Sequence, residues 1–497
     1  MEKKNNGTEY PISEDYPDVI HVEKENHRII VVSDLHLSGG QYQEDGKYRA
    51  NENFFYDDEF AYFLEYLEKN QNEKPWKLII NGDFIDFIRL TEYPRPSEYA
   101  YWKDILKDVD INMEIVDFKI SERERDLGLR THQYKSVWKM DFIANTHTTF
   151  FKALAQFIDN GNKLVIIKGN HDVEFWWEKV RVKLKHIILN HLNLNRSDPK
   201  AKKISDSIEF CDRAYILENK IFIEHGNQYE KITSITKPTL DKGKNDELML
   251  PYGSFMNRYF LNKVELIAPY IDNIKPPTAY IDAIFKNYPI RSIKILTRYI
   301  PLTWKVLKKK YYRETIKLVR KIAKYSLFPL SIIFLILLPS IYSPYKYFLS
   351  SIPLIGKSLA NITVGIFISF VASILPFIVP TMMRKDHISP AIKKITNQYP
   401  KLSYVIMGHF HSPDQRKYRS CSYYNSGSWV PNIILHEKLR ASVCLCLILI
   451  EKNKAGEFQD PILRKWNNCS GQLEKIILIE NAAHNVHKKI VKKYKNI

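Results

Sequence analysis

The length, composition and charge of this chain restrict its fold and its partners. At 497 residues it is long enough for a large core with insertions, or for two modules. Its five cysteines form no CxxC pair, which argues against a zinc knuckle and against a disulfide scaffold. The net charge of +18 would suit nucleic acid, but much of the excess lies in one segment. Nucleic-acid binding is therefore the lesser interpretation.

The first segment, residues 1–27, is polar and of mixed charge. It has no apolar stretch preceded by basic residues. We therefore expect no secretory signal peptide in it.

Five apolar, β-branched runs predict buried strands, and each leads into a polar motif. The runs are residues 28–33, 77–81, 163–167, 220–224 and 402–407. In the same order, the motifs are Asp34-Leu35-His36, Gly82-Asp83, Gly169-Asn170-His171-Asp172, His225-Gly226 and Gly408-His409-Phe410-His411. Because loops at the carboxyl ends of strands in an open α/β sheet form one crevice, we expect the motifs to meet there.

Helical patterns separate these strands. Residues 57–69 begin with an acidic turn and carry apolar residues at helical spacing, and residues 149–159 are similar. Residues 442–451 and 475–480 have the composition of closing strands. The predicted fold class is α/β, with two mixed sheets.

The spacing of the motifs predicts one catalytic unit with insertions. Residues 28–240 and 390–485 would form the catalytic domain, and residues 241–389 a helical insertion. A second insertion, residues 87–148, is aromatic and charged. It is either a cap that contacts substrate over the active site or a helical surface insertion that packs on the domain.

The motifs supply the ligands of a two-metal site. Asp83 follows a glycine that allows a tight turn, and its carboxylate could bridge two cations ~3.5–4 Å apart. The other predicted ligands are Asp34, His36, Asn170, His225, His409 and His411. This mixture of nitrogen and oxygen suits two divalent ions, with Mn as first choice and Fe, Zn, Co or Ni as alternatives, rather than Ca. Each motif alone is a weak signal, but their order and completeness together are specific.

His171 is the candidate general acid or oxyanion stabiliser, because it adjoins the predicted ligand Asn170. Asp172 could orient its other ring nitrogen and hold the ring cationic. The alternative for His171 is a structural residue behind the metals. Asp86 either lies behind the metals or starts a helix.

On these motifs the sequence resembles the calcineurin-like metallophosphoesterase superfamily over residues 28–225 and 402–430, including Tyr424-Asn425-Ser426-Gly427-Ser428-Trp429. The resemblance implies a four-layer α/β/β/α sandwich with a dinuclear site. It further implies one metal on Asp34, His36, Asp83 and His411, and the other on Asp83, Asn170, His225 and His409. The stretch His225-Gly226-Asn227-Gln228-Tyr229 is distantly similar to bacterial UDP-2,3-diacylglucosamine pyrophosphohydrolases, which typically carry arginine where this chain has His171.

Two uncharged apolar stretches, residues 326–345 and 358–383, predict a transmembrane hairpin. The second is long enough to span, whereas Pro329, Pro339 and Pro344 leave a re-entrant or interfacial element as the alternative for the first. Ligands on both sides of the insertion require an even number of crossings. Residues 301–325 have an amphipathic pattern and are strongly basic, so we expect both flanks on the cytoplasmic side.

The sequence thus predicts a cell-membrane, multi-pass phosphoesterase with its catalytic domain in the cytoplasm. It would hydrolyse a phosphodiester, pyrophosphate or phosphomonoester, and the hairpin is the reason to consider a lipid-linked substrate. The alternatives are a tethered hydrolase of soluble nucleotides or phosphoproteins, and a non-catalytic scaffold. A scaffold would be expected to have lost ligands, and none is lost. The sequence leaves the oligomeric state open.

Overall fold

The computed structural model describes residues 18–71, 74–238, 240, 247–265, 274–275, 386–431, 433–436, 439–442 and 445–476. The chain divides into two units, Met1–Leu296 with Ile388–Ile497, and Thr297–His387. The predicted amphipathic segment 301–325 and hairpin segments 326–345 and 358–383 lie outside the described residues. Within the described ranges, no helix combines the length and apolar character needed to cross a membrane.

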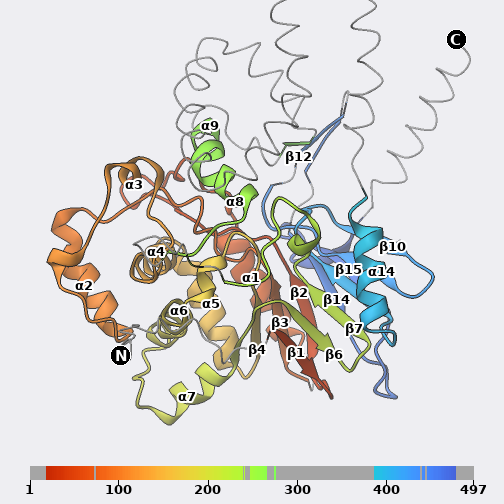
Figure 1. Cartoon of the computed structure of the whole chain (residues 1–497). Coiled ribbons are helices and arrows are strands. Elements are labelled where there is room, and N and C mark those ends of the chain that lie inside the picture. Colours follow the sequence, from red (N-terminus) through yellow and green to blue (C-terminus); the bar gives the residue numbers. More distant parts are fainter. Residues whose placement is uncertain are drawn as a thin grey trace, which may run out of the picture. The chain divides into compact units, whose positions relative to one another are not determined.

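A seven-stranded sheet carries the first three motifs, in the order β16-β15-β14-β2-β3-β4-β5 (Figure 1). Strands β2 to β5 are parallel, and β14 to β16 add antiparallel strands beside β2. All six residues of β3 are buried, as expected of a strand covered on both faces. The strands are β2 Arg28–Val32, β3 Trp76–Asn81, β4 Lys163–Ile167, β5 Ile208–Cys211, β14 Cys446–Ile450, β15 Ile462–Asn467 and β16 Gln472–Lys475.

A six-stranded sheet carries the last two motifs, in the order β1-β6-β7-β9-β11-β10. Strand β9, which follows the insertion in sequence, lies parallel between β7 and β11. The strands are β1 Val19–Val22, β6 Ala214–Leu217, β7 Ile221–Glu224, β9 Tyr404–Met407, β10 Asp414–Lys417 and β11 Ser422–Asn425. A small third sheet joins β8 Ile274–Lys275, β12 Ile433–His436 and β13 Leu439–Ser442.

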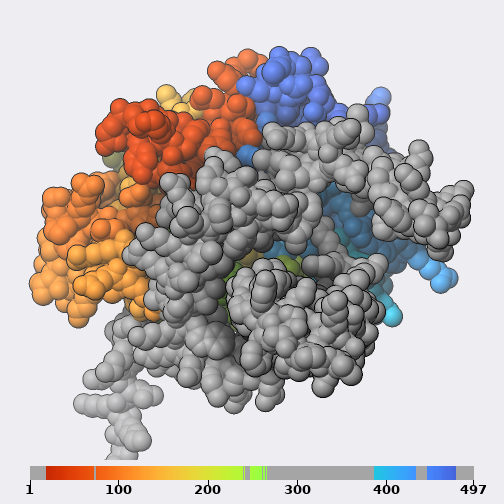
Figure 2. Space-filling model, turned by 90° about the horizontal axis from the view of Figure 1, so that it is seen from above, coloured from red at the N-terminus to blue at the C-terminus, as the bar shows by residue number. Residues whose placement is uncertain are grey.

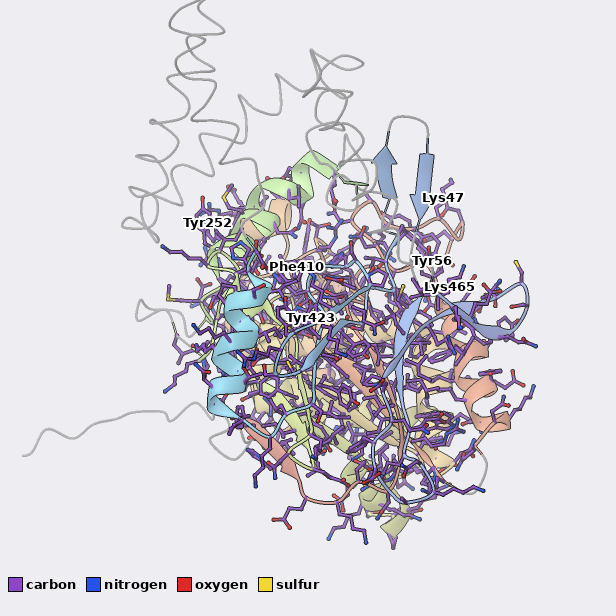
Figure 3. All side chains as sticks on the ribbon, turned by 90° about the vertical axis from the view of Figure 1, so that its right-hand side faces the viewer. Lys47, Tyr56, Tyr252, Phe410, Tyr423 and Lys465 are labelled. Atoms are coloured by element: carbon purple, nitrogen blue, oxygen red, sulfur yellow. The ribbon has the colours of Figure 1, made fainter. Side chains whose placement is uncertain are left out.

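The two large sheets pack face to face. Ile29 and Val165 of the seven-stranded sheet share one core cluster with Ile223 and Ile406 of the six-stranded sheet. Helix α14 (Ile388–Gln398) covers the outer face of the six-stranded sheet through buried apolar residues such as Ile392. Side chains fill the space between the ribbons, with Tyr423 of β11 in the interior (Figure 3).

Most helices lie on the other side, against the seven-stranded sheet (Figure 1). Helix α1 shows why they form: acidic residues occupy its first turn, Lys69 its last, and Phe60, Phe63 and Leu67 line its buried face. The helices on this side are α1 Asp57–Lys69, α2 Tyr99–Asp108, α3 Glu122–Leu127, α4 Gln133–Thr146, α5 Thr148–Asp159, α6 Glu178–His191 and α7 Pro199–Asp206. Short helices α8 Tyr252–Met256, η5 Asn257–Leu261 and α9 Asn262–Glu265 follow β7.

This mixed α/β fold, with two large sheets and flanking helices, fits the predicted sandwich. The predicted helix at residues 57–69 and the five predicted motif strands are present. The closing strand expected over residues 442–451 is present as β14, but it is shorter, Cys446–Ile450. Strand β13 ends at Ser442 and β14 begins at Cys446, with Leu445 between them at a positive φ of 58°.

The second insertion, residues 87–148, is helical. It contains α2, α3 and α4, and its orange residues gather at one side of the face seen in Figure 2. Trp102 of α2 is buried and stacks on Tyr134, and Lys139 of α4 forms a buried ion pair with Glu174. The segment therefore packs on the catalytic domain, and its role as a substrate-contacting cap stays a prediction.

Candidate metal centre

The predicted ligands meet where strands β2, β3, β4, β7 and β9 end. Three groups of side chains have potential ligand atoms within 4.8 Å of one another. They are Asp34, His36 and His411; His36, Asp83 and His171; and Asp83, His225 and His409. Residues that are up to 377 positions apart in sequence thus converge, because parallel strands deliver their loops to one edge.

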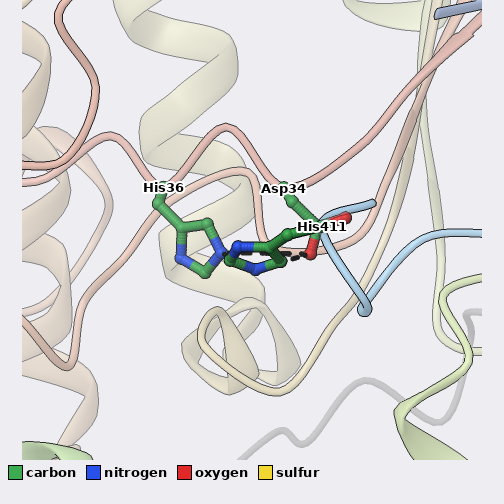
Figure 4. A group of neighbouring side chains, drawn as sticks. All are labelled: Asp34, His36 and His411. Atoms are coloured by element: carbon green, nitrogen blue, oxygen red, sulfur yellow. Dashed lines mark hydrogen bonds and ion pairs between the residues drawn. The ribbon is translucent and has the colours of Figure 1, made fainter. Parts of the chain in front are cut away.

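The first group joins the loop after β2 to the loop after β9 (Figure 4). Nε2 of His411 lies 3.3 Å from Oδ1 of Asp34 and 3.2 Å from Nε2 of His36. Nε2 of His36 is 3.9 Å from Oδ1 of Asp34. Two imidazole nitrogens and a carboxylate oxygen therefore face one small volume, as the ligands of one cation do.

Asp83 connects this group to the next. Its Oδ2 is 3.7 Å from Nε2 of His36 and 3.2 Å from Nε2 of His225. Its Oδ1 accepts hydrogen bonds from the backbone N–H groups of Asn170 (2.9 Å) and His171 (2.8 Å). One oxygen is thus held by the β4 loop while the other lies between two groups of potential ligands.

Hydrogen bonds to the second ring nitrogen orient three of the histidines. Nδ1 of His36 lies 2.9 Å from Oδ2 of Asp86, and Nδ1 of His225 donates to the carbonyl oxygen of Asn81 at 2.8 Å. Nε2 of His409 lies 2.8 Å from Oε2 of Glu230. An imidazole that donates one N–H in this way presents its other nitrogen as a ligand, so each ring is prepared to bind a metal.

Several buried atoms in this cluster have no hydrogen-bond partner. They are Oδ1 of Asp34, Oδ1 of Asn170 and Nε2 of His225. Asn170 turns its amide nitrogen towards Ser254, at 3.4 Å, which leaves its carbonyl oxygen as the free ligand atom. Because a buried acceptor without a partner costs about 1–3 kcal/mol, cations at this place would satisfy an otherwise unfavourable arrangement. The residues present fit a divalent-metal centre.

The backbone of the ligands is strained. Asp34, His36, Asp83, His409 and His411 all have positive φ, between 51° and 67°. Non-glycine residues in this region cost of the order of 1–3 kcal/mol each, and they concentrate at functional sites. The surrounding fold therefore holds five ligands in a geometry that local preference would not choose.

Electrostatics follow from the close carboxylates and imidazoles. Burial acts to raise the pKa of Asp34, but the adjacent His411 and His225 hold that pKa at about 2. Burial and the charge of Asp83 raise the pKa of Asp172 to about 7. Burial opposes protonation of His171, yet the carboxylates of Asp86 and Asp83 raise its pKa to about 9.

The predicted pairing of His171 with Asp172 is wrong. Nδ1 of His171 lies 2.8 Å from Oδ2 of Asp86. The Asp172 carboxylate instead accepts backbone hydrogen bonds from Gly169 (2.6 Å) and Phe84 (2.9 Å). The Asp172 carboxylate therefore connects the β4 loop to the β3 loop, and the carboxylate that orients the His171 ring is that of Asp86.

Sequence reasoning left Asp86 undecided and missed Glu230. Asp86 stands three residues after Asp83, so one turn of chain returns its carboxylate to the same loop, and this spacing was the available signal. Glu230 directly follows the short helix η4 (Asn227–Tyr229) and stands five residues after His225. Its contact with His409 depends on β7 and β9 being neighbours, which local sequence does not reveal.

Comparison with known families agrees with this geometry. Residues 27–252 match the family model described as calcineurin-like phosphoesterase. The chain contains a calcineurin-like phosphoesterase domain. The family indicates a hydrolase acting on phosphoric ester bonds that uses divalent metals. No curated protein matches the chain.

The match to the calcineurin-like phosphoesterase family ends before the last two ligands. It includes Asp34, Asp83, Asn170 and His225, but not His409 and His411. The structure brings these two histidines to the same place through β9. The narrower likeness to UDP-2,3-diacylglucosamine pyrophosphohydrolases stays a prediction.

Proposed function

We propose that this calcineurin-like phosphoesterase hydrolyses phosphate esters or pyrophosphates with two divalent cations held by Asp34, His36, Asp83, Asn170, His225, His409 and His411. The observation that carries the proposal is that Oδ1 of Asp34, Oδ1 of Asn170 and Nε2 of His225 are buried and make no hydrogen bond. A bound cation would give these buried polar atoms the partner that they lack.

The positions of the side chains support a division between two cations. Asp34, His36 and His411 would hold one, and His225 and His409 the other, with Asp83 shared. Asn170, whose backbone N–H binds Asp83, would complete the second set. Bound divalent cations supply Lewis acidity, which neutralises phosphoryl oxygens and lowers the pKa of water. The mixed nitrogen and oxygen donor set suits divalent transition metals, with Mn as the first choice and Fe, Zn, Co or Ni as alternatives.

His171 would act on the leaving group. Asp86 binds its Nδ1–H, which leaves Nε2 as the nitrogen that can meet a substrate oxygen. The side chain is 13% exposed, whereas Asp86 is fully buried, so substrate can reach the imidazole and not the carboxylate behind it. A cationic imidazole in this position could donate a proton or stabilise a developing oxyanion.

Replacing the shared carboxylate tests this proposal. Asp83→Asn should abolish hydrolysis of bis-p-nitrophenyl phosphate and of p-nitrophenyl phosphate, while circular dichroism shows a retained fold. Metal analysis should find two ions per wild-type chain and fewer in the variant. Asp58→Asn, at an exposed position of α1, is the matched control. Undiminished turnover in Asp83→Asn would refute the shared role.

We further propose that residues 241–389 anchor the enzyme at the cytoplasmic face of the cell membrane. The support is the sequence alone: two uncharged apolar stretches, basic flanks, and ligands on both sides of the insertion. A lipid-linked phosphodiester or pyrophosphate is then the leading substrate class.

Fractionation and a substrate screen test these two points separately. The full chain should sediment with membranes and resist carbonate extraction, and recovery in the carbonate supernatant would refute the anchor. Purified enzyme in detergent should release phosphate-containing products from membrane lipid extracts. Efficient cleavage of soluble nucleotides or phosphoproteins with untouched lipids would instead favour a tethered hydrolase of soluble substrates.

A further inference from the structure

A group of arginines lies where the second insertion meets the segment after β7. Thr131 donates from Oγ1 to the carbonyl oxygen of Leu248 at 2.6 Å, and Arg258 donates to the carbonyl oxygens of Gly128 (2.7 Å) and Leu129. Helices α3, α8 and α9 lie on the same side of the domain (Figure 1). The second insertion and residues 247–265 therefore pack against each other and form one surface, here called the wall.

The wall contacts the metal centre directly. Ser254 of α8 donates from Oγ to the backbone carbonyl of Asn170 at 2.9 Å and lies 3.4 Å from its amide nitrogen. Arg258 follows Ser254 by four residues along the continuous helical run α8 to η5. Residues at this spacing are neighbours on one helical face, with Cβ atoms roughly 5–6 Å apart. Arg258 thus lies about one helical turn from Ser254, whose hydroxyl contacts the predicted metal ligand Asn170.

Arg123, Arg130 and Arg258, here called the arginine cluster, are close together. The guanidinium carbons of Arg123 and Arg258 lie 5.1 and 5.4 Å from the centre of the Tyr259 ring. Burial lowers the pKa of Arg123, and the nearby charges of Arg130 and Arg258 act in the same direction. Like charges gathered in this way are unfavourable unless an anion compensates them.

The carboxylates nearby are already engaged. Glu124 pairs with Lys135 at 2.5 Å, and Glu247 lies 3.5 Å from Arg130. Arg258 is buried and bound to carbonyl oxygens. Four cations thus face two carboxylates. Among the described residues, neither Arg123 nor Arg258 has an ion pair with a carboxylate, and of these two Arg258 is the one bound to carbonyl oxygens.

Two donor groups of Arg123 are unsatisfied. Its Nε and Nη2 are buried and have no hydrogen-bond acceptor within the described part of the chain. The amide nitrogen of Gln133, the first residue of α4, is also buried without an acceptor. Guanidinium N–H groups cannot deprotonate to relieve this, so an external acceptor is required.

We propose that the arginine cluster binds a second phosphate of the substrate, one that is not cleaved at the metal centre. The planar fork of a guanidinium matches a phosphate with two parallel hydrogen bonds. The inference rests on the proposed phosphoesterase function and narrows its substrate class. The preferred substrate is a phosphate ester with another phosphate on the group that remains beside the scissile bond.

Two matched compounds test the inference. Thymidine 5′-(p-nitrophenyl phosphate) carries the scissile ester alone, and its 3′-phosphorylated form adds one uncleaved phosphate. Wild-type enzyme should cleave the second with a lower KM. Arg123→Gln should raise KM for the second compound roughly 10- to 100-fold, as expected for lost charged hydrogen bonds. It should leave kcat for both compounds, and KM for the first compound, unchanged.

The controls separate charge from structure. Arg125→Gln, on the exposed face of α3, should match wild type with both compounds. Arg123→Lys keeps the charge but loses the fork, so its KM should lie between those of wild type and Arg123→Gln. An equal KM effect of Arg123→Gln on both compounds, or none on either, would overturn the inference.

A binding measurement keeps the test independent of turnover. Calorimetry on the chelator-treated full chain should show inorganic phosphate binding that Arg123→Gln weakens and Arg125→Gln does not. If wild type cleaves neither compound but binds phosphate through Arg123, the proposed function fails and the anion site stands. If wild type cleaves both and Arg123→Gln binds phosphate as wild type does, the anion site fails and the function stands.

Discussion

The carboxylate of Asp86 serves two imidazoles with a single oxygen. Oδ2 lies 2.9 Å from Nδ1 of His36 and 2.8 Å from Nδ1 of His171, and Oδ1 accepts the backbone N–H of Arg89 at 3.0 Å. Asp86 is fully buried, so solvent does not compete for these bonds. One side chain therefore orients both a predicted metal ligand and the predicted acid.

Asp86→Asn should reduce turnover without unfolding the chain. The amide has the shape of the carboxylate but not its charge, so both imidazoles lose a strong acceptor. Such residues behind metal ligands typically contribute 10- to 100-fold in metal affinity or activity. We expect a fall of that order in kcat/KM for bis-p-nitrophenyl phosphate, measured beside Asp104→Asn at an exposed position of α2. Unchanged kinetics and metal affinity would remove Asp86 from the site.

Gly169 is required because Asp83 occupies the space of a side chain. A Cβ at this position would lie 2.2 Å from Oδ1 of Asp83. Gly169→Ala should therefore displace the shared carboxylate, lower metal affinity at least 10-fold, and destabilise the fold by about 1–3 kcal/mol. Isothermal titration with Mn²⁺ and urea unfolding would measure the two effects.

Gly46→Ala provides the comparison for Gly169→Ala. Gly46 has a positive φ of 68° and open space around it, so alanine there is strained but touches nothing. It should lose some stability and bind Mn²⁺ normally. If Gly169→Ala also binds Mn²⁺ normally, close packing against Asp83 is not what this glycine provides.

At the scale of single residues, the sequence predicted the metal ligands but not the residues that orient them. Asp34, His36 and Asp83 follow recognisable strands, so their convergence was predictable. Asp86 and Glu230 act through hydrogen bonds to histidines from other strands, which no local pattern encodes. The predicted role of Asp172 was wrong because side chains of adjacent residues need not point the same way. Asp172 binds the backbone of its own loop, whereas the His171 ring binds Asp86.

At the scale of elements, His147 joins two helices to a loop. It lies between α4 and α5, with Nδ1 3.0 Å from Asp57 of α1 and Nε2 3.3 Å from Glu52. Glu52 in turn accepts the backbone N–H groups of Ser38 and Gly40. A buried imidazolium thus fixes the helices against the loop that carries His36.

This junction predicts a loss of stability at alkaline pH. Burial opposes the charge on His147, but Glu52 and Asp57 raise its pKa from 6.5 to about 10. Because the folded chain binds this proton more tightly, the contribution is complete below pH 6.5 and is lost as pH rises through about 10. Urea unfolding of chelated protein between pH 6.5 and 10 should show a declining midpoint.

His147→Gln should remove much of that decline and cost about 3–5 kcal/mol at pH 7, because it leaves buried Glu52 without its cation. His21→Gln, at an exposed position of β1, should keep the wild-type profile. A pH profile of His147→Gln parallel to that of wild type would place the alkaline loss elsewhere.

The elements themselves were largely predictable where the pattern was periodic and uninterrupted. Helix α1 occupies the predicted residues, since its capping charges and apolar face agree. The start of β14 after Ser442 was not predictable, because an apolar run gives no sign that one of its residues, Leu445, has a left-handed backbone conformation. A helical second insertion was one of the two alternatives, but the bounds of its helices were not predicted, since aromatic residues such as Trp102 and Tyr134 pack on each other.

At the scale of the whole molecule, the metal centre needs both parts of the chain that flank the insertion. Strand β9 lies between β7 and β11, and β14 lies between β2 and β15. The two sheets are therefore each completed by residues after position 386. The family match, over residues 27–252, covers a domain that could not close its site alone.

Replacement of residues 276–385 with a flexible linker should leave the metal centre intact. All seven predicted ligands lie outside this range, and so do both large sheets. The shortened chain should bind two Mn²⁺ ions and cleave bis-p-nitrophenyl phosphate within about threefold of the full chain. The same deletion with His411→Asn should lose activity. Failure of the simple deletion to bind metal would show that the insertion is part of the catalytic unit.

The late position of β9 has a consequence for synthesis. A ribosome delivers Asp34, His36, Asp83, Asn170 and His225 first, and more than 180 further residues pass before His409 and His411 emerge. Any product that terminates within that interval carries five of the seven ligands and lacks the strand that would bring the others. Catalytic competence is therefore acquired late in translation, and prematurely terminated chains should be unable to degrade phosphate esters.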